Sequence, residues 1–588
     1  MNEWMEDPTQ WYAALVEQVG AEALVPAWDA AAYQSVTDKI SDYAGLCDWF
    51  EQDPENPERI TMAQAILAGF FQRPTRCNRR VGELVKSLPW RFRAQKKIGD
   101  VEPSVLRWLT VSDARGLSKY LCRNDKRQLL LDSVSELSGE AVACLLSVGV
   151  LGLSGLTELT EEVASELGQY SGELLLDGLT SLDPLFAGLL SDSPYTLAGL
   201  SMNGLTVLSI HAVLRRESAY MSFGGLTELT DVKVASALAQ CHGELKLGGV
   251  KRLSGEAAAA LAGYPDTLSL DGLTEMSLEA AQGLALHQGA LWLEGLEHLS
   301  EEAAKALGKK QGTLGLTGLT TLSTRVANGL STLQSNIWLS NLETLEADAA
   351  KALAKIKGCL GLGGLMALSD AAAAGLSTHT GGLRLERLMD IEPAGAASLG
   401  RTHGELWLDG LDQLPFEIAT GLSGHEGGLS LDHLPEMLPE ASVCLGDTLG
   451  FLRLDGLNVL PPEVAKGLEK HQGNVSLKAV HTLCEGSAKY LSTIQGDINL
   501  TDIRTLEVET ALALKYHLGT LALPRLDKAN RALLQALRKH KRGPVIIDGA
   551  TMTLGGIVFL AKRNYSNLMI SDKMQSKVEQ AKRWVKAE

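Results

Sequence analysis

Leucines recur in this sequence every 23 residues over its longest regular stretch. In the frame L-x-L-x-x-L-x-x-L, the first apolar position falls at 245, 268, 291, 314 and 337, and it continues at the same interval to 521. Less regular copies begin at 129, 151, 174, 200 and 221, and the pattern fades at 545 and 568. A unit this small cannot bury its own leucines, so neighbouring units must stack on one another.

Residues 289–311 show how one unit is expected to fold. Leu291 and Leu293 alternate with Trp292, which is the period-two pattern of a short strand. A Glu-Gly turn follows, and residues 301–307 have the alanine and leucine spacing of a helix that begins after a serine N-cap. Stacked units place their strands in one parallel sheet. Because helices need about 10 Å and strands only about 4.8 Å, the strand surface should be concave.

The unit resembles the leucine-rich repeat family, whose pattern L-x-x-L-x-L-x-x-N is partly matched by L-x-L-x-x-L. It is most similar to bacterial repeats of the form LxLxGLxxLsxexAxaLa. The family's asparagine is replaced here by leucine or valine, at Leu296, Leu319, Leu342, Leu411 and Val250. The resemblance implies a curved α/β solenoid, with parallel strands on the concave side, helices on the convex side and no asparagine ladder. It implies an architecture and no particular activity.

The rest of the chain differs from the repeats. Residues 1–98 show no repeat and contain tryptophan-rich amphipathic pieces, so we expect an all-α N-terminal domain that caps the array. Residues 99–544 should form the solenoid, and residues 545–588 should form degenerate repeats and a helical C-terminal cap.

Composition indicates a cytoplasmic protein that has no membrane segment. The acidic N-terminus is not followed by an apolar stretch, which argues against a signal peptide. The eight cysteines are scattered without a CxxC pair, which argues against disulfides and structural zinc. The net charge of −17 is uneven, because basic segments at 73–97 and 525–588 flank an acidic body.

The residues beside and between the strand leucines should face the concave surface. Three tryptophans share the middle position, and the glycine at 315 should leave open space between two of them. Tryptophan and arginine dominate the binding energy of many protein interfaces. The candidate partner-binding residues are Lys246, Trp292, Glu294, Trp338, Arg384, Glu386, Trp407, Asp409, Phe451, Arg453 and Asp455. Alternatively, large aromatics merely cover a strand surface that favours them.

The accompanying carboxylates make this surface mixed or negative, which disfavours nucleic acid and favours a protein partner of unknown identity. We therefore expect a non-enzymatic scaffold or adaptor. No nucleotide-binding, zinc-protease or nucleophile motif occurs in a credible setting, so neither catalysis nor a cofactor is expected.

A second function is left open by basic residues interleaved with aromatic ones. These are Arg73, Arg76, Arg79, Arg80, Arg91, Arg93, Lys96 and Lys97. Such a pattern is typical of nucleic-acid contact, which would also use the basic C-terminal region. It is equally compatible with binding to anionic lipid or acidic protein, or with a structural role against the acidic parts of the chain.

Histidines recur near the expected helix ends, where the helix dipole favours them. The eight are His242, His287, His379, His403, His425, His471, His517 and His540. Those at 379, 403 and 425 could lie one repeat apart, which leaves metal binding open.

Overall fold

A computed structural model of the chain describes residues 108–109, 114, 118, 128–131, 134–183, 185, 189–190, 197–206, 218–527, 529–540, 543–547, 554–562, 567–570 and 572–587. The expected N-terminal helical domain, with its basic segment, lies outside these residues. The chain divides into two units, residues 1–252 with 264–269 and residues 253–263 with 270–588. Each is described by itself.

The first unit holds the less regular repeats. Its strands are β1 (Trp108–Leu109), β2 (Gln128–Leu130), β3 (Glu136–Leu137), β4 (Val150–Gly152), β5 (Glu173–Leu175), β6 (Gly199–Ser201), β7 (Tyr220–Ser222), β8 (Glu228–Leu229), β9 (Glu244–Lys246) and β11 (Thr267–Ser269). Its helices are α8 (Gly139–Leu145), α9 (Glu161–Gly168) and α11 (Val232–Leu238). Strand β10 (Arg252–Leu253) spans the boundary between the units in the sequence.

The second unit holds the regular repeats, each with one short strand. These strands are β12 (Leu291–Trp292), β13 (Leu314–Gly315), β14 (Ile337–Trp338), β15 (Leu360–Gly361), β16 (Leu383–Arg384), β17 (Leu406–Trp407), β18 (Leu429–Ser430), β19 (Leu452–Arg453), β20 (Val475–Ser476), β21 (Ile498–Asn499), β22 (Leu521–Ala522), β23 (Val545–Ile546) and β24 (Leu568–Met569). Each strand pairs in parallel with the next one along the chain.

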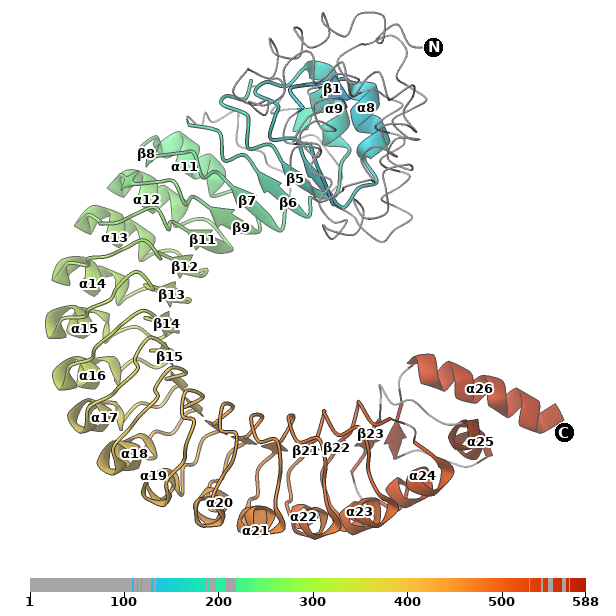
Figure 1. The fold of residues 1–588 in the computed structure, drawn as a ribbon. Coiled ribbons are helices and arrows are strands. Elements are labelled where there is room, and N and C mark those ends of the chain that lie inside the picture. The colour runs from blue at the N-terminus through green and yellow to red at the C-terminus, as the bar shows by residue number, and fades with distance from the viewer. Residues whose placement is uncertain are drawn as a thin grey trace, which may run out of the picture. The chain divides into compact units, whose positions relative to one another are not determined.

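Helices alternate with these strands, and all but the last lie towards the outer side of the arc that the second unit forms (Figure 1). They are α12 (Gly255–Leu261), α13 (Leu278–Leu284), α14 (Glu301–Leu307), α15 (Thr324–Leu330), α16 (Ala347–Leu353), α17 (Asp370–Leu376), α18 (Pro393–Leu399), α19 (Phe416–Leu422), α20 (Pro439–Gly446), α21 (Pro462–Gly467), α22 (Glu485–Leu491), α23 (Val508–Ala513), α24 (Arg531–Leu537), α25 (Leu554–Lys562) and α26 (Asp572–Ala587). The 3-10 turns Leu468–Lys470 and Leu514–Tyr516 extend α21 and α23.

The predicted repeat frame and solenoid fold are confirmed by the strand register. Within the first unit Leu129 pairs with Leu151, and within the second unit Leu291 pairs with Leu314, so the first apolar positions of neighbouring repeats lie side by side. The pairing also continues through Val545 and Leu568, where the sequence pattern fades. No helix among the described residues is long and apolar enough to cross a membrane.

The core lies between the strands and the helices. Leu291, Leu293 and Leu296 of one repeat are fully buried, and so is Leu307 of helix α14. The helix begins where predicted, because the side chain of Ser300 accepts a hydrogen bond from the backbone N–H of Ala303 at 3.1 Å. Leucine at the family's asparagine position therefore belongs to this core. Its side chain cannot form the hydrogen bonds between repeats that the asparagine forms in the family.

A column of glycines lets successive backbones approach each other just before most strands of the second unit. A Cβ atom at Gly404 would lie 1.9 Å from the carbonyl oxygen of Gly381, and one at Gly473 would lie 1.8 Å from that of Gly450. The obstacle is backbone in both cases, which cannot rotate away. At Gly404 and Gly473 a larger residue would therefore separate two repeats. The corresponding position before β14 holds Ser335, whose hydroxyl donates a hydrogen bond to the carbonyl oxygen of Gly312 at 2.6 Å.

We predict that Gly473→Ala lowers the free energy of unfolding by about 1–3 kcal/mol, as overpacking does elsewhere. Urea denaturation followed by circular dichroism measures this. Gly248→Ala is the matched control, because no atom lies within 4 Å of a Cβ there. Equal stability of the two variants would contradict the steric role of the column.

A second column lies between the end of each helix and the next strand and holds mostly polar side chains. Its members occupy the same position of successive repeats and are all buried: His287, Lys310, Leu333, Ile356, His379, Thr402, His425, Thr448, His471, Ile494, His517 and His540. Backbone carbonyls satisfy much of this polarity. The Lys310 ammonium donates to the carbonyl oxygens of His287 at 3.0 Å and Gly289 at 2.6 Å, and burial lowers its pKa to about 8.

The imidazoles do not form the neighbouring set that the sequence left open. Thr402 occupies the column between His379 and His425, whereas His403 is exposed. His517 and His540 are neighbours, with ring centroids 5.6 Å apart. Among the described residues, no three His, Cys, Asp or Glu side chains are placed to hold a metal ion.

Burial lowers the pKa of the His379 and His471 imidazoles below the ordinary value, because the charged form would lose its hydration. Below a pH of about 6.5 the unfolded chain therefore binds protons that the folded chain does not. The stabilising contribution is complete above that pH and is lost as pH falls towards the folded-state pKa, by up to about 1.4 kcal/mol per pH unit for each imidazole.

We predict that the double variant His379→Thr and His471→Thr unfolds with a shallower loss of stability between pH 7 and pH 5 than the parent protein. Threonine already occupies the column at Thr402 and Thr448. Ile494→Thr is the control, because it places the same side chain in the column without removing an imidazole and should lower stability equally at every pH. Parallel pH profiles for all three proteins would refute the prediction.

Candidate functional site

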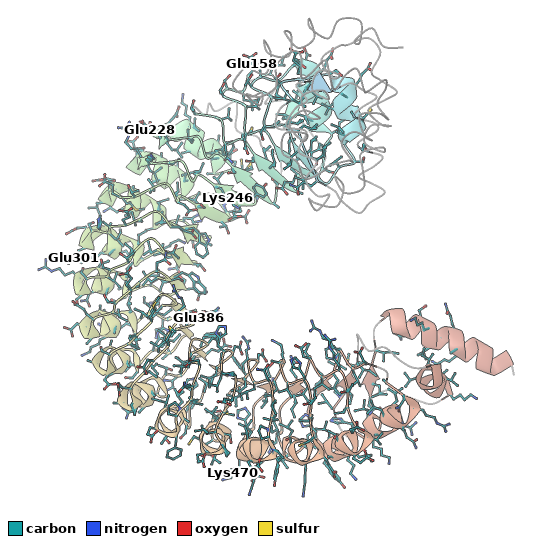
Figure 2. The ribbon with its side chains drawn as sticks, in the orientation of Figure 1. Glu158, Glu228, Lys246, Glu301, Glu386 and Lys470 are labelled. Carbon is teal, nitrogen blue, oxygen red and sulfur yellow. The ribbon has the colours of Figure 1, made fainter. Side chains whose placement is uncertain are left out.

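The middle residues of successive strands form one row on the strand side of the second unit. Trp292 is in register with Gly315, Gly315 with Trp338, and Trp338 with Gly361. The row continues through Arg384, Trp407, Ser430 and Arg453. Figure 2 shows Glu386 on this side of the unit and Glu301 and Lys470 on the helix side.

The glycine between Trp292 and Trp338 does not leave open space, which corrects the expectation from sequence. The six-membered ring of Trp292 covers Gly315, where a Cβ atom would lie 2.1 Å from the Trp292 Cε3 atom. The ring of Trp338 covers Gly361 in the same way, with a corresponding distance of 2.4 Å. Each ring therefore lies on the neighbouring repeat, and the tryptophans are half-buried rather than fully exposed.

Arg384 joins two of the tryptophans. Its guanidinium carbon lies 5.5 Å from the ring centroid of Trp338 and 4.6 Å from that of Trp407, within the range of cation–π attraction. Its Nε atom donates a hydrogen bond of 2.5 Å to Glu386 Oε1. The arginine is thereby held from three sides. Trp338, Arg384 and Trp407 form a continuous aromatic and cationic surface.

The remaining basic candidates have similar local partners. The Arg453 guanidinium carbon lies 5.6 Å from the Phe451 ring centroid, and its Nη1 atom lies 3.5 Å from Asp432 Oδ2. Lys246 belongs to the first unit, where its Nζ atom lies 3.1 Å from Glu244 Oε2 and 5.0 Å from the ring centroid of Tyr220.

The aspartates that follow the strands connect repeats to each other. Asp409 Oδ1 accepts hydrogen bonds from the Ser430 hydroxyl at 2.6 Å and the Asp432 N–H at 3.0 Å. Asp455 Oδ1 repeats this with the Ser476 hydroxyl at 2.5 Å and the Lys478 N–H at 3.1 Å. These bonds form a polar ladder between turns, in place of the missing asparagine ladder.

The charges along this ladder are not equivalent. Burial raises the pKa of Asp432 above its ordinary value, and the neighbouring carboxylates of Asp409 and Asp455 raise it further. Burial would also raise the pKa of Asp455, but hydrogen bonds from Lys478 and Ser476 outweigh it, so the pKa lies below the ordinary value. Asp455 therefore stays ionised as an acceptor within the structure.

We predict that Asp455→Ala lowers the free energy of unfolding by about 1–3 kcal/mol, because it leaves the Ser476 hydroxyl, the Lys478 N–H and the Lys478 ammonium without their acceptor. Asp455→Asn keeps an oxygen at this position and should cost less. Denaturant unfolding of both variants at neutral pH measures the difference. The ladder would have no structural role if alanine and asparagine were equally tolerated.

The sequence reasoning missed two parts of this surface. The first is the role of the small residues, since the rings of Trp292 and Trp338 pack directly on the backbone of Gly315 and Gly361. The second is the ladder that gives Asp409 and Asp455 a structural task besides any contact with a partner. The signals were present as alternating large and small middle residues and as Asp-Gly pairs that begin at 409 and 455. Glu294 and Glu405 keep exposed side chains at opposite ends of the tryptophan row.

The basic candidates from Arg73 to Lys97 lie outside the described residues. Nucleic-acid contact through them stays a prediction.

No protein-family model and no curated protein matches this chain. Among solved structures, the chain is similar to a leucine-rich repeat protein of Leptospira interrogans, with 20% identity over 74% of this chain and 98% of the other and a TM-score of 0.31. It is similar to an internalin of Listeria monocytogenes, with 13% identity over 54% and 88% of the two chains and a TM-score of 0.35. It is also similar to TLR13 in its complex with a single-stranded RNA, with 14% identity over 79% and 90% and a TM-score of 0.32. At these scores the leucine-rich repeat architecture rests on the strands and helices of this chain itself.

Proposed function

We propose that this protein is a non-enzymatic scaffold or adaptor, and that the strand side of residues 291–455 binds a protein partner. The row formed by Trp292, Trp338, Arg384 and Trp407 carries this proposal. Large aromatic and guanidinium groups there are held against the sheet by neighbouring repeats and stay partly accessible.

Fixed side chains of this kind favour binding for a physical reason. A partner loses affinity when flexible side chains must be ordered, at about 0.5–1.5 kcal/mol for each one. Trp292 and Trp338 are already placed over their glycines, and Arg384 is already held between two rings. Most of the free-energy cost of ordering side chains therefore comes from the partner. The aromatic contacts of this protein then contribute more of their interaction energy to affinity.

The charges beside the row indicate what kind of partner fits. Glu294 and Glu405 are exposed, and neither is paired with a basic side chain in the described structure. Carboxylates around an aromatic surface favour a partner that carries lysine or arginine, and they repel a nucleic-acid backbone.

We predict that replacing Trp292, Trp338 and Trp407 together with alanine reduces capture of the partner more than tenfold in affinity purification from lysate, with quantitative mass spectrometry as the readout. The expected loss follows from about 2 kcal/mol or more for each aromatic anchor. The matched control is Leu278, Phe416 and Val443 to alanine, which removes three apolar side chains exposed on helices α13, α19 and α20.

Circular dichroism must show that both triple variants fold. Unchanged capture by the tryptophan variant would remove the proposal. Capture that is instead abolished by moderate salt and by charge reversal at Arg76, Arg79, Arg80, Arg91 and Arg93 would favour the nucleic-acid alternative, since phosphate contacts weaken steeply with salt.

A further inference from the structure

The starts of the helices in the second unit change character in three consecutive repeats. Helices α12 to α15 and α17 begin at a serine N-cap whose side chain accepts a backbone hydrogen bond, at Ser254, Ser277, Ser300, Ser323 and Ser369. Helices α19, α20 and α21 instead begin at Pro415, Leu438 and Pro461, and none of these side chains accepts such a bond. An apolar N-cap is less favourable for a helix than serine. Departures of this kind in adjoining repeats are expected at a functional surface.

The same three helix starts expose large apolar side chains. Phe416 is 50% exposed, Leu438 is 58% exposed, and Val459, in the turn before α21, is 61% exposed. Helix α19 packs against α20 and α20 against α21. First-turn residues of neighbouring helices lie close together, since a Cβ atom at Gly486 would lie 3.1 Å from Pro462 Cγ. The exposed apolar residues at these helix starts, which we call the apolar edge, are Pro415, Phe416, Leu438, Pro439, Val459 and Pro461.

Carboxylates accompany the apolar edge without basic counterparts. Glu417, Glu440 and Glu463 lie in the first turns of the three helices, and Glu436 lies in the turn before α20. All four are exposed, and no ion pair among the described residues includes them. Helices α19 and α20 hold no lysine or arginine, and α21 holds only Lys466, in its last turn. The surface around the apolar edge is therefore negative.

This negative charge discriminates between possible occupants. A second copy of the chain, docked through the same edge about a twofold axis, would bring these carboxylates against their own counterparts, because such an interface pairs a patch with itself. Anionic lipid and nucleic acid would be repelled for the same reason. A protein segment that presents apolar side chains flanked by lysine or arginine is favoured both by burial of the apolar edge and by charge.

We propose that the apolar edge docks a basic amphipathic segment of a second protein partner. Its apolar side chains contact Phe416, Leu438 and Val459, and its lysines or arginines pair with the first-turn glutamates of the three helices. Proline at the helix starts fixes the local backbone, so little of this surface has to be ordered on binding. The apolar edge is built from helix starts and not from the strand row, so the inference goes beyond the proposed function. The protein then holds one partner on each surface.

The test uses the full-length protein and a fluorescent amphipathic peptide of leucine and lysine, with fluorescence anisotropy as the readout. Saturable binding is expected. It should weaken about tenfold in the double variant Phe416→Gln and Leu438→Ser, which removes two apolar contacts. Replacing Glu417, Glu440 and Glu463 together with glutamine should weaken it severalfold. Leu286→Ser is the matched control, because Leu286 is 64% exposed but follows the end of α13.

Leu438→Ser also separates docking from folding. It installs the N-cap residue that the other repeats use, so this single variant should unfold at an equal or higher urea concentration than the parent protein while it binds the peptide less tightly. Weaker binding that is accompanied by a loss of stability in this variant would contradict the inference, because the effect would then be structural.

No binding of the peptide, equal binding of a peptide with glutamate in place of lysine, or equal losses in the double variant and in Leu286→Ser would each overturn the inference. Indifference to the glutamine variant would do so as well. A dimer in analytical ultracentrifugation that Leu438→Ser dissociates would replace the basic partner with a second copy.

The two proposals fail independently. The helix-side triple variant, which includes Phe416→Ala, should weaken peptide binding and leave capture by the strand side intact, whereas the tryptophan triple variant should do the reverse. If the tryptophan variant alone lowers peptide binding, the inference falls and the proposed function stands.

Discussion

Contact between consecutive repeats is the interaction on which the structure depends. Most helices of the second unit have about seven residues, too few to be stable alone in water, and its strands have two. Such elements persist because each repeat covers the leucines of the one before it. The approach is closest at the glycine column, where a Cβ atom at Gly473 would lie 1.8 Å from backbone. Stability is then close to a sum of neighbouring interfaces.

The contacts that hold the repeats together also shape the strand face. Trp292 lies over the glycine of the next repeat, so it covers the sheet and presents a surface at the same time. Asp409 bonds to the next turn while adding charge to the face. Covering the strands and binding a partner are therefore compatible roles, although the sequence presented them as alternatives. A change on this face alters both packing and recognition.

Periodic features were predictable from the sequence and contacts between repeats were not. The period placed Leu291 and Leu314 in register, and Ser300 marked the start of its helix, because each signal lies within one unit. The ring of Trp292 over Gly315 depends on a rotamer and on a residue of the next repeat. Sequence reasoning treated that glycine as open space for this reason. The expectation that His379, His403 and His425 are neighbours failed for a similar reason. A shift by a single position in the sequence moves a side chain out of the buried column, as it does at His403.

The alternation of large and small residues has a consequence for how the array can change in length. Inserting or deleting one whole unit within it would bring two large side chains side by side, or two small ones. The strand face contains one such junction, where Arg384 adjoins Trp407. The Arg384 guanidinium there lies close to the rings of both Trp338 and Trp407. The modular element of this surface is thus a pair of repeats, whereas the modular element of the fold is a single one.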